Sequence, residues 1–163
     1  MAETPQKGKL LRPVDDEARA LARGLLAGAR FGALGVMQDG APFVTRIALG
    51  LDAGPNSGLV SLVSTLSQHT SALKTEPRCS LLVGEPGPKG DPLTHPRLTV
   101  LAAAEFVTKD AGLRKRWLEY HPKAKLYIGF SDFGFVRFDV REAFLNGGFG
   151  YACKLDAADL GLR

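Results

Sequence analysis

Seven polar residues crowd one short segment of this 163-residue chain, where an apolar run gives way to a helical pattern. The first N–H groups of a helix have no partner inside it, and the helix dipole is positive at that end. Hydroxyls and an imidazole gathered there indicate a phosphate site. The alternative is simple N-capping, which needs Ser67 alone. The seven residues are Ser64, Thr65, Ser67, Gln68, His69, Thr70 and Ser71.

Arg46 is the second unusual residue, because it interrupts the apolar segment 42–51. Strand alternation places it on the face opposite Ile47. An arginine in mid-strand must reach solvent or pair with an anion, since burying it alone is costly. Segments 42–51 and 58–65 are consecutive and are expected to pair. Arg46 and the polar segment would then converge on one phosphate, although an exposed strand face explains Arg46 equally well.

Other common sites are missing from the sequence. It contains neither of the two usual glycine-rich phosphate loops and no G-x-S-x-G elbow. His69, His95 and His121 lack the spacing of metal ligands, so no metal site is expected. Cys79 and Cys153 form no C-x-x-C pair, which suits a reducing cytoplasm.

Charge and hydropathy exclude further classes. There are 21 basic and 17 acidic residues, giving a net charge of +4. No basic stripe with interleaved aromatic residues is present, so no nucleic-acid partner is expected. No apolar run approaches the ~18 residues of a membrane span, so no membrane association is expected. The opening segment has no apolar stretch behind its charges, so no secretory signal is expected either.

The elements that would position these residues are short. The 19 glycines and 10 prolines favour many turns rather than a helical bundle. We expect a flexible segment over 1–12 and a single domain over 13–163. No βαβ rhythm recurs, so the fold class is mainly β (α+β), a small antiparallel barrel or sandwich with peripheral helices. Helices are expected over 16–29, 67–77 and 110–120 and from near Asp156, and strands over 31–37, 42–51, 58–65, 78–84, 97–107 and 133–145.

Three segments resemble the FMN-binding split-barrel family, which includes pyridoxamine 5′-phosphate oxidase, and most closely its haem-utilisation-related branch. They are S-x-L-x-x-H-T-x-x-L (64–73), P-R-x-S-L-L (77–82) and R-L-T (97–99). The resemblance implies a six-stranded antiparallel split β-barrel that forms a homodimer, with FMN at the subunit interface.

The resemblance also implies a set of FMN contacts. Arg46, Ser64 and Thr70 would hold the phosphate, and His69 would donate to it or cap the helix. Arg97 would lie near the flavin, reaching across the dimer, unless it is only a solvated strand end. Trp117 would do likewise, although its helical spacing with Leu113 is more typical of a core residue. The full set is Arg46, Ile47, Val63, Ser64, Gln68, His69, Thr70, Arg97 and Trp117.

The chain departs from the oxidase at two places. The oxidase carries an Arg-Lys pair where this chain has His69 and Thr70, and the C-terminal segment YACKLDAADLGLR does not match. Pyridoxamine-phosphate oxidation is therefore not expected. We expect an FMN-dependent oxidoreductase acting on a small redox substrate, which the sequence does not identify. The alternatives are a haem-binding or haem-degrading protein on the same fold, and a flavin-binding module without turnover.

Overall fold

The computed structural model describes residues 11–148 and 150–162. Its helices are α1 (Asp16–Gly28), α2 (Gln68–Thr75) and α3 (Ala111–Tyr120), with 3₁₀ turns η1 (Pro92–Thr94) and η2 (Pro122–Leu126). Its strands are β1 (Phe31–Gln38), β2 (Ala41–Ala48), β3 (Gly50–Asp52), β4 (Gly58–Ser64), β5 (Arg78–Val83), β6 (Arg97–Val107), β7 (Phe133–Asn146) and β8 (Ala152–Asp156).

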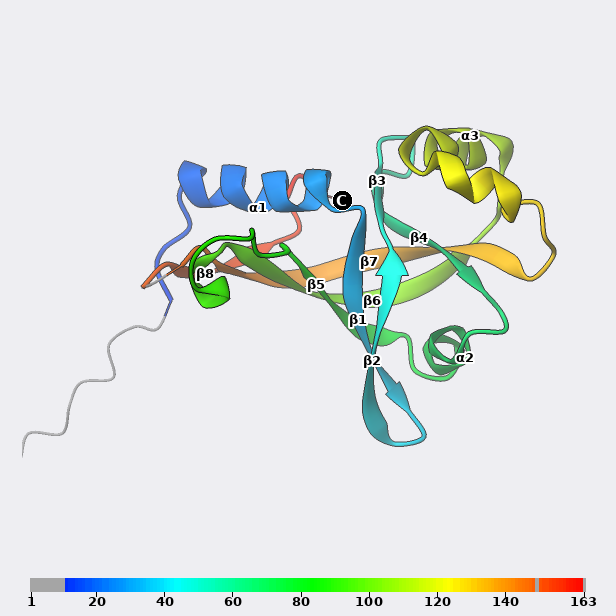
Figure 1. The fold of residues 1–163 in the computed structure, drawn as a ribbon, viewed down its shortest axis with the longest axis horizontal. Helices are drawn as coiled ribbons and strands as arrows, with labels where there is room; N and C mark the ends of the chain where they lie inside the picture. Colours follow the sequence, from blue (N-terminus) through cyan, green and yellow to red (C-terminus); the bar gives the residue numbers. More distant parts are fainter. Residues whose placement is uncertain (1–10, 149, 163) are drawn as a thin grey trace, which may run out of the picture.

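The eight strands form one antiparallel sheet in the order β2-β1-β5-β6-β7-β4-β3, with β8 also paired to β7. The sheet curls back on itself and brings β4 next to β2, where the Ser61 hydroxyl donates to the Ala48 carbonyl at 2.6 Å. Ile47 and Val63, from strands near the two ends of this order, therefore share one apolar core. Figure 1 shows the helices at the periphery, with α1 at the left, α3 at the upper right and α2 at the lower right.

Local sequence signals explain several elements. The Asp15 carboxylate accepts a hydrogen bond from the Ala18 N–H at 2.8 Å and so caps α1. Asp110 caps α3 in the same way, through the Leu113 N–H at 2.9 Å. The Asp39-Gly40 turn between β1 and β2 has φ values of 51° and 78°, the left-handed conformation that a tight hairpin requires. An aspartate just before a helical pattern predicts an N-cap and an Asp-Gly pair predicts a tight hairpin, so all three features follow from the local sequence.

The prediction of six strands is wrong, because there are eight in the described residues. The expected strand 42–51 divides at Leu49, which is fully buried and donates its N–H to the Arg30 carbonyl at 2.9 Å. The short helix expected from near Asp156 is also wrong, since residues 157–161 form turns that follow the strand β8. There Cys153 and Leu155 alternate inward as strand side chains do.

The predicted pairing of 42–51 with 58–65 is only partly right. β3 pairs with β4, with Leu51 opposite Leu59, whereas β2 pairs with β1. Residues 1–10 of the expected flexible segment lie outside the described residues, as does Phe149. Arg12 is described, and its N–H donates to the Ala152 carbonyl at 2.7 Å, beside β8.

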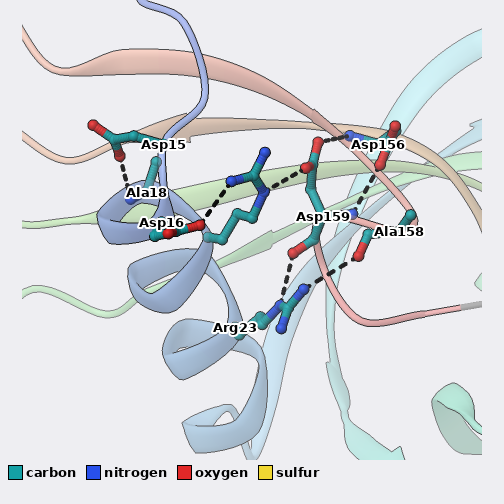
Figure 2. Close-up of polar contacts among 8 residues, drawn as sticks. Asp15, Asp16, Ala18, Arg23, Asp156, Ala158 and Asp159 are labelled. Atoms are coloured by element: carbon teal, nitrogen blue, oxygen red, sulfur yellow. Dashed lines mark hydrogen bonds and ion pairs between the residues drawn. The ribbon is translucent and has the colours of Figure 1, made fainter.

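A polar clasp joins α1 to the segment after β8. Arg19 Nε donates to the Asp159 carboxylate at 2.8 Å, and Arg23 Nε donates to the Asp159 carbonyl at 2.7 Å. Asp156 and Asp159 exchange hydrogen bonds between carboxylate and backbone N–H, at 2.8 and 3.0 Å. Figure 2 shows Asp159 and Ala158, in the segment after β8, held against the helix by these contacts.

Candidate functional site

The polar segment found in the sequence forms the corner between β4 and α2. Ser64 ends β4 opposite Phe133 of β7, and the Thr65 N–H donates to the Asp132 carbonyl at 2.8 Å. Beyond the turn, Ala72 and Leu73 of α2 are buried in the main core. The helix is therefore anchored by its inner side while its first turn lies at the edge of the barrel.

Two hydroxyls of this corner are already used within the protein. The Ser64 hydroxyl donates to the Asp132 carboxylate at 2.7 Å and accepts the Leu66 N–H at 3.1 Å. The Thr70 hydroxyl is buried and donates to the Ser64 carbonyl at 2.6 Å. Ser64 and Thr70 thus hold the turn in shape, and their hydroxyl hydrogens do not point to an external anion.

The donors left over lie in the first turn of α2. Ser67 occupies the N-cap position but makes no side-chain cap hydrogen bond. The helix geometry gives the N–H groups of Gln68 and His69 no acceptor within the helix. Together with the Gln68 amide and the Ser67 hydroxyl, they can receive an anion at the positive end of the helix dipole.

His69 is half-buried, and burial lowers the pKa of its imidazole. The ring is therefore neutral around pH 7 and would act as a hydrogen-bond donor or a metal ligand rather than as a cation. The other histidines are engaged. His95 bonds the Gly87 N–H and the Lys89 carbonyl with its two ring nitrogens, at 3.1 and 2.7 Å. His121 bonds the Leu49 carbonyl at 2.7 Å.

Arg46 lies on the outer face of the sheet, exposed, with its guanidinium 5.3 Å from the centre of the Phe31 ring. It forms no hydrogen bond or ion pair with the 64–70 corner in the described residues. Convergence of the two on one phosphate thus stays a prediction. Ile47 and Val63 are buried in the main core, so only their backbone could meet a ligand at the surface.

Arg97 lies at the far end of the barrel from α2. It begins β6 opposite Asn146, whereas Val107 at the other end of β6 pairs with Phe135, next to the corner. Ten residues of strand separate the two ends, roughly 33 Å. Arg97 of one chain therefore does not reach α2 of the same chain, and its guanidinium donates to the Leu93 carbonyl at 3.0 Å.

Trp117 belongs to a second, smaller core between α3 and β4. Its side chain is 3% exposed, and its ring stacks on His121 with the centroids 4.3 Å apart. The indole N–H has no hydrogen-bond partner among the described residues. Trp117 is thus a core residue in this structure, which agrees with the structural interpretation of its helical spacing.

Lys109 and Asp132 act on the corner from elements distant in the sequence. Asp132 supports Ser64, and Lys109 binds the loop that carries Asp132. Neither residue is predicted as part of the site from the sequence, because each is one ordinary charged residue in a loop. The described residues contain no group of three or more His, Cys, Asp or Glu side chains placed to hold a metal ion. They also include no helix long and apolar enough to cross a membrane.

Comparison with known proteins gives a consistent family. A family model described as CREG, beta-barrel, matches residues 13–160. The chloroplastic non-canonical heme oxygenase HOZ of Arabidopsis thaliana is 30% identical over 138 residues, which cover 82% of this chain and 40% of that protein. This chain therefore spans well under half the length of that relative.

Two solved structures extend the comparison. A heme-binding protein from Mycobacterium smegmatis is 28% identical with a TM-score of 0.78, covering 92% of this chain and 61% of that one. A general stress protein 26-related protein of the pyridoxinephosphate oxidase family, from Clostridium acetobutylicum, has a TM-score of 0.67 at 13% identity. That match covers 90% of this chain and 99% of the other. At this low identity the match shows the fold alone.

Proposed function

This chain belongs to the CREG β-barrel family, a split barrel like that of the pyridoxine-phosphate oxidases, and from that premise we propose that it is an FMN-binding oxidoreductase. The observation that carries the proposal is the open first turn of α2. Its N-cap residue Ser67 makes no side-chain cap, while its hydroxyl-rich surroundings hold the turn in place. A phosphate monoester is the anion that suits such a helix end.

In this proposal the residues divide into ligands and supports. Gln68, His69 and the adjacent N–H groups bind the phosphate, and Ser64 and Thr70 keep the turn in shape. The flavin itself supplies hydride or electron transfer, so the protein needs only to bind and orient it. This agrees with the lack of any recognised nucleophile or acid–base constellation in the sequence.

We further propose that the site is shared between two copies of the chain. Arg46 stands on an outer face where Phe31, Val44 and Leu82 are 39%, 67% and 45% exposed. Leu82 and Arg46 both lie beside Ala33, so the apolar residues surround the arginine. A homodimer packed on this face would cover the apolar surface and bring Arg46 and Arg97 toward the partner's flavin.

The test is a titration of the purified protein with FMN, followed by quenching of flavin fluorescence. Arg46→Ala is expected to weaken binding at least about tenfold, since a charge-assisted contact contributes about 1.5–3 kcal/mol. Arg141→Ala is the matched control, because its side chain is exposed and pairs only loosely with Asp139 at 3.7 Å. A wild-type protein that neither binds FMN nor gains thermal stability from it would refute the proposal.

A haem-binding or haem-degrading role is the second candidate. Two relatives near 30% identity carry heme in their names, and His69 is the one histidine whose ring makes no hydrogen bond within the described residues. Titration with haem, followed by its Soret band, distinguishes this role. A band that shifts in wild type but not in His69→Ala would support it.

The third candidate is a flavin-binding module without turnover. If FMN binds but is not reduced by NADH or NADPH, this non-catalytic role gains support.

A further inference from the structure

We propose that Lys109 is a positioning residue for the cofactor site, acting through the loop 127–132 rather than by touching the ligand. This inference rests on the proposed function, because it concerns the α2 corner assigned above to the phosphate. Lys109 stands between β6 and the Asp110 cap of α3, and it has no contact with α2 among those described.

The Lys109 ammonium is fully occupied by backbone carbonyls. Nζ donates to the carbonyls of Ile128 at 2.8 Å, Phe130 at 3.0 Å and Phe133 at 2.8 Å. An ammonium has three donors, so each one is used. No carboxylate forms an ion pair with Lys109 in the described residues. The side chain therefore fixes the path of a loop rather than balancing a charge.

The three carbonyls bracket the residue that supports the corner. Asp132 lies between Phe130 and Phe133, its carboxylate accepts the Ser64 hydroxyl at 2.7 Å, and its carbonyl accepts the Thr65 N–H at 2.8 Å. The backbone carbonyl of Ser64 in turn accepts a hydrogen bond from the Thr70 hydroxyl at 2.6 Å. Lys109 is thus connected to the first turn of α2 by hydrogen bonds at both ends of the path and by the loop backbone between them.

The side-chain type matters for this role. A flexible lysine stem can direct three donors at three converging carbonyls, whereas the planar guanidinium of arginine has a fixed fork. Methionine has a similar length and no donor, so it would leave the carbonyls without their partner. Lys109→Met should therefore loosen the loop, and Lys109→Arg should keep part of the contact.

The experiment compares Lys109→Met, Lys109→Arg and the control Lys115→Met, which changes an exposed lysine of α3. Three quantities are measured: global unfolding in urea, the FMN dissociation constant, and hydrogen exchange of the Thr65 and Leu66 amides. Their acceptors are the Asp132 carbonyl and the Ser64 hydroxyl. In Lys109→Met we expect exchange of both amides to rise at least roughly tenfold and FMN binding to weaken by about tenfold, with Lys109→Arg intermediate and Lys115→Met unchanged.

A purely structural role would give a different result. Lys109→Met would then lower global stability without selective exchange at Thr65 and without a change in FMN affinity, and that outcome overturns the proposal. If Lys109→Met does not fold, Asp132→Ala removes the carboxylate that holds the Ser64 hydroxyl, the acceptor of the Leu66 amide. Unchanged FMN binding and unchanged Leu66 exchange in that variant would overturn the proposal. Failure of the wild type to bind FMN refutes the proposed function, whereas the exchange measurement still decides whether Lys109 controls the corner.

Discussion

Asp52 shows how strongly a single residue can depend on partners far away in the sequence. Its side chain is 1% exposed, and its carboxylate binds Arg116 and Arg137 together with the Gly54 N–H. Arg116 lies on α3 and Arg137 on β7, so the carboxylate joins the second core to the main sheet. A buried charge of this kind is tolerated only because hydrogen-bonded partners surround it.

Asp52→Ala is therefore expected to destabilise the fold by about 3 kcal/mol, at the lower end for a buried pair because a third of Arg116 is exposed. The loss comes from leaving two guanidinium groups without their counter-ion. Urea unfolding measures it. Asp139→Ala is the control, since that carboxylate is 63% exposed and should change stability by less than about 0.5 kcal/mol. Equal effects of the two substitutions would contradict the role given to Asp52.

The stabilisation from Asp52 should depend on pH in a defined direction. Burial alone would raise the pKa of this carboxyl, but the hydrogen bonds from Arg116, Gly54 and Arg137 together lower it below the unfolded value of 3.8. The contribution is therefore present above that pH and lost as the pH falls through the folded pKa. The stability difference between wild type and Asp52→Asn should shrink below pH 3.8, and a gap that widens there would contradict this account.

At the scale of elements, the sequence predicted those features that depend only on neighbouring residues, such as helix caps and tight turns. Asp15 and Asp110 each cap the helix that follows them, and the Asp39-Gly40 pair forms the tight β1–β2 hairpin that such a pair predicts. The division at Leu49 and the strand β8 were not predicted, because both depend on pairing with residues distant in the sequence. The alternation of buried Cys153 and Leu155 could have predicted β8. The glycines just before it indicated a flexible break instead, so the strand was not expected there.

The clasp between α1 and the segment after β8 gives a prediction for these elements (Figure 2). Asp159→Ala removes the acceptor of Arg19 Nε and one partner of the Asp156 N–H. We expect a loss of roughly 1 kcal/mol, typical of a partly exposed pair, with faster exchange of the Leu160 amide. The Leu160 N–H donates to the Asp156 carbonyl at 3.3 Å and so reports the local loss. Unchanged Leu160 exchange would show that the clasp does not hold this turn.

At the scale of the whole molecule, we expect the outer face of β1, β2 and β5 to form the interface of the proposed homodimer. Val44→Asp places a charge on the most exposed apolar side chain of that face, 67% exposed. In the proposed homodimer this charge would be buried without a partner, which is costly. Sedimentation should then show a dimer for wild type and a monomer for the variant. Leu126→Asp, which changes an equally exposed leucine on η2, should leave the dimer intact.

The candidate site was predictable only in part, because some of its predicted residues lie far apart within one chain. The cluster 64–71 is continuous in the sequence, so its composition revealed it directly. Arg97 stands at the other end of a long strand, and Arg46 on the outer face of the barrel. One copy of the chain does not bring these two together with α2. In the proposed homodimer their meeting would depend on an interface that residue spacing does not encode.

The clasp between α1 and the segment after β8 also affects how the chain folds during its synthesis. Arg19 and Asp159 are 140 positions apart, so a nascent chain exposes this helix long before its partner is translated. At a synthesis rate of roughly 5–20 residues per second, the delay is roughly 7–28 seconds. During that time α1 can pack on β3 and β6, but the hydrogen bonds that Arg19 and Arg23 donate to Asp159 cannot form. The first helix to be synthesised therefore gains its last polar contacts only when the segment after β8 is made.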